Sequence, residues 1–155
     1  MTDKELNIAL REMARANGLC DEWYGKWSDD DTIDECLDRF VRGFDFCEER
    51  DYPRLDFIVR NFRVEDLHRH NIFVGEEIDL GFDGSGYIVC LGSCSGRISL
   101  AGHIAVTIYL RHTSSIEVEA SDGAWVSIVR YDQSECYAVN DELSRVKIYD
   151  RTSIK

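Results

Sequence analysis

The C-terminal half of the chain shows an alternation of hydrophobic and polar positions that repeats every twenty residues. β-Branched and aromatic residues alternate with polar ones in short runs, as they do in half-buried β-strands. Three such runs, 106–110, 126–130 and 146–150, start twenty residues apart, and shorter runs at 116–118 and 136–138 have the same spacing. A fixed period with strand-like alternation inside each unit indicates a repeat architecture.

Two architectures can accommodate these strands. In a β-solenoid, each coil of about twenty residues contributes short strands, and equivalent positions of successive coils stack in parallel. In an antiparallel β-meander, hairpins join the strands, and Asp122 followed by Gly123 is a common hairpin dipeptide. A meander has no reason to repeat every second strand, so the period favours a short β-solenoid of three coils.

The N-terminal part follows helical periodicity instead. Thr2 and Glu5 have the spacing of a capping box, apolar residues then recur three and four positions apart, and Asn17 with Gly18 can end a helix. Three to four helices are predicted before the solenoid, which makes the chain an α+β protein. Their expected ranges are 3–16, 33–47, a helix that begins at Pro53, and a short helix within 64–71.

A glycine-rich stretch separates the two parts. Residues 75–86 contain four glycines, which indicate turns between modules. We therefore expect an acidic helical module over residues 1–74, a connector over 75–86 and a repeat β module over 87–155. The connector holds an acidic cluster, and loops often carry binding and catalytic residues. It is the candidate site for a small ligand, a metal ion or an enzymatic reaction, with Glu76, Glu77, Asp79 and Asp83 as its residues.

The net charge of −12 is unevenly distributed along the chain. Residues 17–52 contain 12 acidic and four basic residues, a net charge of −8. Such a field repels nucleic acid and attracts basic surfaces, although an acidic stretch can also be a solvated face that maintains solubility. We expect an acidic face that binds a basic surface of another protein. Its residues are Asp29, Asp30, Asp31, Asp34, Asp38, Asp45, Glu48 and Glu49.

No catalytic motif stands out in the sequence. Cys90 and Cys94 lack the second pair that a zinc-finger site needs, and His68 and His70 would share a face only on a strand. No serine lies in a nucleophile-elbow pattern. We therefore predict a non-enzymatic protein with no catalytic residues, no cofactor and no metal ion.

The expected location is the cytoplasm. No apolar run approaches the roughly 18 to 20 residues needed to span a bilayer, and the N-terminus lacks the basic and apolar regions of a signal peptide. In that reducing compartment the cysteines are expected to be reduced and buried in the core. They are Cys20, Cys36, Cys47, Cys90, Cys94 and Cys136. Trp23 and Trp27 are also expected to pack between helices, with an exposed binding patch as the alternative.

Two stretches resemble a known group of proteins. One runs from Asp45 through Pro53 to Phe62, and the other is the series of strand units that ends in residues 147–151. Together they resemble small proteins of gut-bacterial phages and prophages that join a helical N-terminal part to a β-solenoid-like tail. The resemblance implies a cytoplasmic protein of a mobile element. With the acidic segment, it leads us to expect an inhibitor of a host defence or nucleic-acid-processing enzyme, with a structural or assembly protein of the phage particle as the alternative.

The last coil of a solenoid exposes backbone groups that favour assembly. The helices can cover the first coil, and Arg145, Lys147 and Arg151 discourage uncontrolled strand addition at the last one. We expect a homodimer or a small closed homo-oligomer joined through the C-terminal coils. Its expected contact residues are Tyr137, Ile148, Tyr149 and Ile154.

Overall fold

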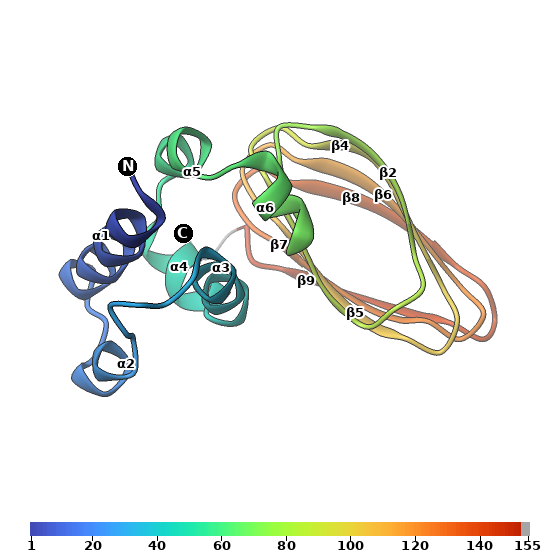
Figure 1. The fold of residues 1–155 in the computed structure, drawn as a ribbon. Helices are drawn as coiled ribbons and strands as arrows, with labels where there is room; N and C mark the ends of the chain where they lie inside the picture. Colours follow the sequence, from blue (N-terminus) through green and yellow to red (C-terminus); the bar gives the residue numbers. More distant parts are fainter. Residues whose placement is uncertain (153–155) are drawn as a thin grey trace. The chain divides into compact units, whose positions relative to one another are not determined.

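Helices and strands occupy separate parts of the chain (Figure 1). In the computed structural model, which describes residues 1–152, the chain divides into a helical unit, Met1–His70, and a solenoid unit that begins at Asn71. The helices are α1 (Asp3–Ala16), α2 (Asp21–Gly25), α3 (Ile33–Arg42), α4 (Phe44–Arg50), α5 (Leu55–Asn61) and α6 (Val64–Arg69). None of them is long and apolar enough to cross a membrane. The predicted order, helices first and solenoid second, is confirmed.

The starts of two helices follow from their caps. Thr2 accepts a backbone hydrogen bond at the start of α1, and Thr32 with Glu35 forms a complete capping box at α3. The single helix expected over 33–47 is two helices, because Gly43 ends α3 and begins α4, and glycine disfavours a helix interior. The apolar stripe continues across this break. Its buried residues are Ile33, Cys36, Leu37, Val41, Phe44 and Cys47.

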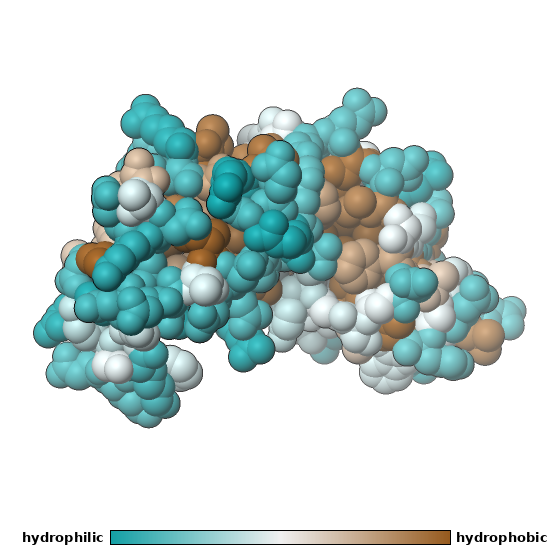
Figure 2. Space-filling view, viewed as in Figure 1, coloured by the Kyte–Doolittle hydropathy of each residue, from teal (hydrophilic) through white to brown (hydrophobic). Residues whose placement is uncertain are grey.

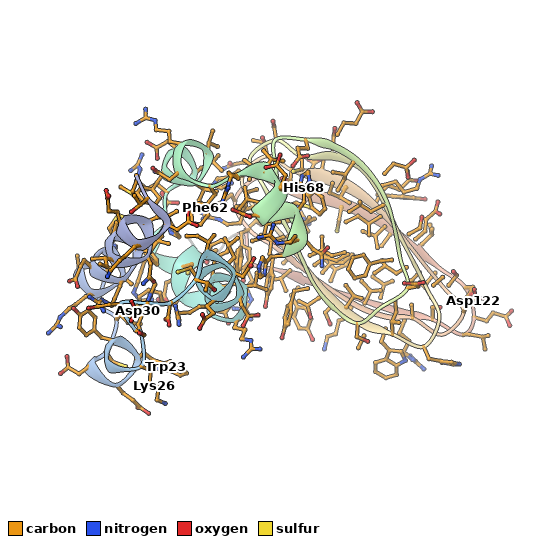
Figure 3. All side chains as sticks on the ribbon, in the orientation of Figure 1. Trp23, Lys26, Asp30, Phe62, His68 and Asp122 are labelled. Carbon is orange, nitrogen blue, oxygen red and sulfur yellow. The ribbon has the colours of Figure 1, made fainter. Side chains whose placement is uncertain are left out.

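A buried amide holds the loop between α2 and α3 against α1. Asn7 is 0% exposed, and its Nδ2 donates to two carbonyls of that loop, at 3.0 and 3.1 Å. Its Oδ1 accepts a hydrogen bond from Trp27 Nε1 at 2.6 Å. Trp27 is buried as expected, whereas Trp23 is 57% exposed, with Lys26 Nζ 4.8 Å from its ring centroid (Figure 3). The expected packing is therefore wrong for Trp23, because the five-residue α2 has no buried side.

Two parallel sheets form the solenoid unit. Sheet A has the order β1-β3-β5-β7-β9 and sheet B the order β2-β4-β6-β8, so the chain alternates between the sheets (Figure 1). The strands are β1 (Ile72–Val74), β2 (Glu77–Phe82), β3 (Gly86–Leu91), β4 (Ser95–Ala101), β5 (Ala105–Leu110), β6 (Ser115–Ser121), β7 (Trp125–Arg130), β8 (Glu135–Asn140) and β9 (Arg145–Asp150). Every strand pair is parallel, which confirms the β-solenoid and excludes the antiparallel meander. Asp122 lies at a solenoid corner between β6 and β7 instead of a hairpin (Figure 3).

The first coil departs from the twenty-residue period. From β3 onward, paired residues such as Ile108 and Ile128 are 20 positions apart in the sequence. Ile72 of β1 and its partner Val89 of β3 are only 17 positions apart. Paired residues of β2 and β4 are 18 positions apart. The range 75–86 was expected to be a connector, but it contains β2. The solenoid therefore makes about four turns, and the expected number of three is wrong. The glycines and the shortened coil hide this strand from a search for the period.

The core of the solenoid unit lies between its sheets, where Figure 2 shows hydrophobic residues in brown. Inward positions of successive coils stack in columns, and Ile88, Ile108 and Ile128 are each 0% exposed. Small hydroxyl side chains close one corner. Ser114 and Ser134 are also 0% exposed, and each Oγ donates to a carbonyl of the preceding coil, at 3.0 and 3.1 Å. Both serines therefore tie their corner to the coil before it, Ser114 through Gly92 and Ser134 through Leu110.

The cysteines differ in burial. Burial is confirmed for Cys36, Cys47, Cys90 and Cys94. Cys136 is half-buried, and the expectation is wrong for Cys20, which is exposed at the start of α2. The hydrogen bond shared with Cys94, together with burial, raises the pKa of the Cys90 thiol. This thiol is therefore protonated at neutral pH.

Candidate functional site

The expected acidic face of the helical unit is largely paired with cations of the same unit. Six of its eight residues form ion pairs: Asp29 with Arg11, Asp30 with Lys4, Asp31 with Arg39, Asp34 with Arg69, Asp38 with Arg42 and Glu49 with Arg50. Asp45 is exposed, whereas Glu48 is only 7% exposed, so its placement on a solvated face is wrong. Several of these cations lie outside residues 17–52, and they offset the charge that the segment carries alone.

Asp34 illustrates how the fold uses such a carboxylate. Its Oδ1 lies 2.9 Å from Arg69 Nη2 and 2.9 Å from His70 Nε2. Hydrogen bonds from His70 and then from Arg69 lower the pKa of Asp34 below its ordinary value of 3.8. Arg69 also pairs with Asp66 at 2.5 Å, so these groups form a small network at the end of α6. Asp34 thus contributes contacts within the helical unit.

The outer face of sheet B is a second acidic surface, which we call the acidic sheet face. Side chains alternate along a strand, so the residues between the core positions point outward. The charged outward residues are Glu77, Asp79, Arg97, Glu117, Glu119 and Glu135. Arg97 Nε lies 3.4 Å from Glu117 Oε2 and 3.7 Å from Glu119 Oε1. One arginine therefore faces five carboxylates, and the surface has a formal charge of −4.

The outer face of sheet A has a different character. No outward position of its described strands carries a carboxylate, and its cations are Arg145 and Lys147. Trp125 is 62% exposed. The rings of Tyr87 and Tyr109 stack in parallel with their centroids 6.2 Å apart. The solenoid unit is therefore acidic on one outer face and aromatic with some positive charge on the other.

A shallow hollow of about 370 Å³ adjoins the acidic sheet face. Its lining includes Glu117, Glu135 and Tyr137. Gly96 also lines it, and only glycine fits there, because an added Cβ would lie 1.9 Å from the Ile78 carbonyl oxygen and φ is +120°. Two carboxylates beside a small hollow suit the cationic end of a lysine or arginine side chain.

The expected Glu76–Asp83 loop is mostly a strand. β2 includes Glu77 and Asp79, whose side chains point outward from sheet B, while Asp83 lies at the turn that follows. The structure therefore spreads these carboxylates along a sheet edge. Within residues 1–152, no group of three or more histidine, cysteine, aspartate or glutamate residues is placed to hold a metal ion.

The expected oligomer contacts lie on the last two strands. Tyr137 on β8 is 67% exposed, and Ile148 and Tyr149 on β9 are 46% and 37% exposed. Ile154 lies outside the described residues. The described contacts thus share one end of the solenoid unit.

Comparison with protein-family models, with curated proteins and with solved structures finds no match. Only Glu77 and Asp79 of the acidic sheet face belonged to an expected site, because its other carboxylates are dispersed along the sequence. The signal that could have found it is the outward position of Glu117 and Glu119 within the repeat, combined with that of Glu135 in the next coil.

Proposed function

We propose that this protein is a non-enzymatic interaction module that binds a basic surface of another protein. The observation that carries the proposal is the acidic sheet face, where five carboxylates and a single arginine stand on parallel strands. Side chains on adjacent strands stand about 4.8 Å apart, and alternate residues of one strand about 6.8 Å apart. This fixed grid meets the lysines and arginines of a partner without first ordering a flexible segment, which lowers the entropic cost of binding.

The hollow beside Glu117 and Glu135 supplies an anchor for the same partner. An arginine that enters it can donate charge-assisted hydrogen bonds to a carboxylate, which are shorter and stronger than neutral ones. The surrounding carboxylates steer a basic surface toward the site, and salt screens that attraction. We therefore expect an association that is fast and strongly dependent on ionic strength.

The partner class follows from the charge and from the resemblance to phage and prophage proteins. Surfaces that bind nucleic acid are rich in lysine and arginine and neutralise phosphates. A rigid acidic face can occupy such a surface. The proposed partner is a host defence or nucleic-acid-processing enzyme, and binding excludes its nucleic acid.

Two charge-reversed variants of the full chain test this proposal. One replaces Asp79, Glu117 and Glu119 on the acidic sheet face with lysine. The matched control replaces Asp38, Asp45 and Glu49 of the helical unit and changes the net charge by the same amount. We expect the first variant to bind the partner isolated from host lysate about a hundredfold more weakly, because like charges then meet.

Calorimetric titration at low and at moderate salt measures both variants, and circular dichroism verifies that each is folded. The control is expected to bind like the unmodified protein. Loss of binding in the control alone would assign the interface to the acidic residues of the helical unit. Affinity that is insensitive to both variants and to salt would contradict the proposal.

A further inference from the structure

The C-terminal end of the solenoid unit leaves its core open. Ile148 in the last coil is 46% exposed, whereas Ile128, one coil earlier in the same column, is 0% exposed. Ala138 in the last coil is half-buried, whereas Val118, which pairs with it one coil earlier, is 0% exposed. Within residues 1–152, no strand pairs with the outer edge of β8 or of β9. Open edges with apolar inward residues are sites for further strand pairing.

The two open edges carry opposite charges. The outward residues of β9 include Arg145 and Lys147, whereas β8 begins with Glu135 and the turn after it contains Glu142. The edges also differ in height. β9 follows β8 along the coil, and one full turn advances by one strand spacing, so β9 extends past β8 by about half a strand spacing, roughly 2.4 Å. The end is therefore a step with a basic upper edge and an acidic lower edge.

We propose that two copies of this chain join end to end through this step, related by a two-fold axis parallel to the strands. That rotation places β9 of each copy antiparallel to β8 of the other. Each high edge meets a low edge, and each basic edge meets an acidic one. The contact is self-complementary, as a two-fold interface must be. It shares Glu135 and Tyr137 with the acidic sheet face and its hollow, whereas Asp79, Glu117 and Glu119 lie outside the contact.

The inward residues fix the register of this pairing. Residues directly opposite each other in an antiparallel pair share one face. Val146 opposite Ala138 and Ile148 opposite Cys136 continue the core from one copy into the next. The same register brings Lys147 beside the Tyr137 ring of the second copy, which is a favourable cation–π arrangement.

The other simple two-fold arrangement pairs β9 with β9 and β8 with β8. It brings Arg145 and Lys147 of both copies together, and Glu135 of both copies likewise. The two β9 strands would touch first, and the step would hold the β8 strands about 9.6 Å apart, twice the normal strand spacing. Like charges and the unfilled gap disfavour this arrangement.

Charge exchange between the edges tests the proposal by sedimentation velocity. Arg145→Glu with Lys147→Glu makes both edges acidic, and Glu135→Lys with Glu142→Lys makes both basic. Each variant is expected to raise the dimer dissociation constant by at least about tenfold, because like charges meet at both seams. An equimolar mixture of the two variants restores the dimer. All four positions are exposed, so the coil is expected to stay folded, which circular dichroism verifies.

A variant that combines all four substitutions, at positions 135, 142, 145 and 147, separates the two arrangements. It exchanges the charges of β8 and β9, so it pairs with itself but not with the unmodified protein if β9 meets β8. Native mass spectrometry of a mixture then finds only the two homodimers. Free mixing of the two forms would instead support β9 against β9 and overturn the proposal. Unmodified protein that is monomeric at high micromolar concentration would also overturn it.

A disulfide tests the register directly. Ile148→Cys, made in a Cys20→Ser background, is expected to cross-link to Cys136 of the second copy upon mild oxidation. Opposed residues of an antiparallel pair have Cα atoms about 4.5–5.5 Å apart, which suits a disulfide. Within one copy the two positions lie on sheets about 10 Å apart, too far for a bond. Lys147→Cys in the same background is the control and is expected to remain uncross-linked on a non-reducing gel.

Discussion

At the residue scale, a single buried amide decides how the helical unit closes. Asn7 satisfies two loop carbonyls and the indole N–H of Trp27 at once, in a position with 0% exposure. Its position on the apolar side of α1 does not predict this role, because periodicity identifies only which side is buried. The partners are 20 to 22 residues away, so the contacts depend on tertiary structure.

We predict that Asn7→Ala destabilises the helical unit by about 2–3 kcal/mol, because a buried indole N–H and two carbonyls lose their partner. Urea unfolding monitored by the fluorescence of Trp27 measures it, in a background where Trp23 and Trp125 are phenylalanine. Asn17→Ala is the control. Its Nδ2 donates to Met13 O at 2.8 Å in an exposed position, so the loss should be below about 1 kcal/mol. Equal losses in the two variants would contradict the role given to Asn7.

Asp34 gives a prediction about pH. Its pKa is lower in the folded chain than the ordinary 3.8, so its pairing stabilises the helical unit above about pH 4. That contribution is lost as the pH falls through the lowered pKa. We expect Asp34→Asn to lower the melting temperature slightly at pH 7 and to have a smaller effect near pH 3. Thermal melts at both pH values test this, and added salt should reduce the difference at pH 7.

At the scale of elements, Gly96 marks the place where the short first coil meets the regular ones. Its φ of +120° and the 1.9 Å approach of a Cβ to the Ile78 carbonyl exclude any side chain. We predict that Gly96→Ala destabilises the solenoid unit by more than about 2 kcal/mol. Gly81→Ala on β2 is the matched control, since nothing lies within 4 Å of an added Cβ there. It should change the stability by less than about 0.5 kcal/mol, as measured by urea unfolding with circular dichroism.

The repeat could be predicted from the sequence wherever its spacing is regular. Positions 108, 128 and 148 are isoleucine, and their stacking in one column follows from the period alone. The range 72–82 could not be assigned to strands in this way, because offsets of 17 and 18 residues break the period. The expected helix over 33–47 is divided at Gly43, because glycine disfavours a helix interior. The apolar stripe does not predict this break, since it continues on both sides of Gly43.

The candidate sites were less predictable than the fold. The acidic segment of the helical unit has a strong charge in the sequence, but Arg11 and Arg69 reach its carboxylates from distant positions. Only Glu77 and Asp79 of the acidic sheet face lie in a local charge cluster, and the whole face appears only when Glu117 and Glu135 are placed on adjacent strands. Carboxylates that are far apart in the sequence can be assigned to one surface only when the register of the strands is known.

At the scale of the whole molecule, the two proposed interfaces share Glu135 and Tyr137 on β8 and otherwise use different residues of the solenoid unit. We predict that lysine at positions 79, 117 and 119 weakens partner binding and leaves self-association unchanged. Arg145→Glu with Lys147→Glu should do the reverse. Sedimentation velocity and calorimetric titration on both variants test this independence, because side chains on separate surfaces usually act additively. Loss of both properties in either variant would show that dimer formation and partner binding are coupled.

The twenty-residue register has a consequence for how this chain can change in length. From β3 onward every coil returns to the same position after twenty residues. A gain or loss of one twenty-residue block by gene duplication or deletion preserves both corners, both outer faces and the chemistry of the open end. An insertion of one residue within a strand turns its core side chains toward solvent. Descendants of this gene should therefore differ in the number of whole coils, and each added coil would extend the acidic sheet face by one more strand.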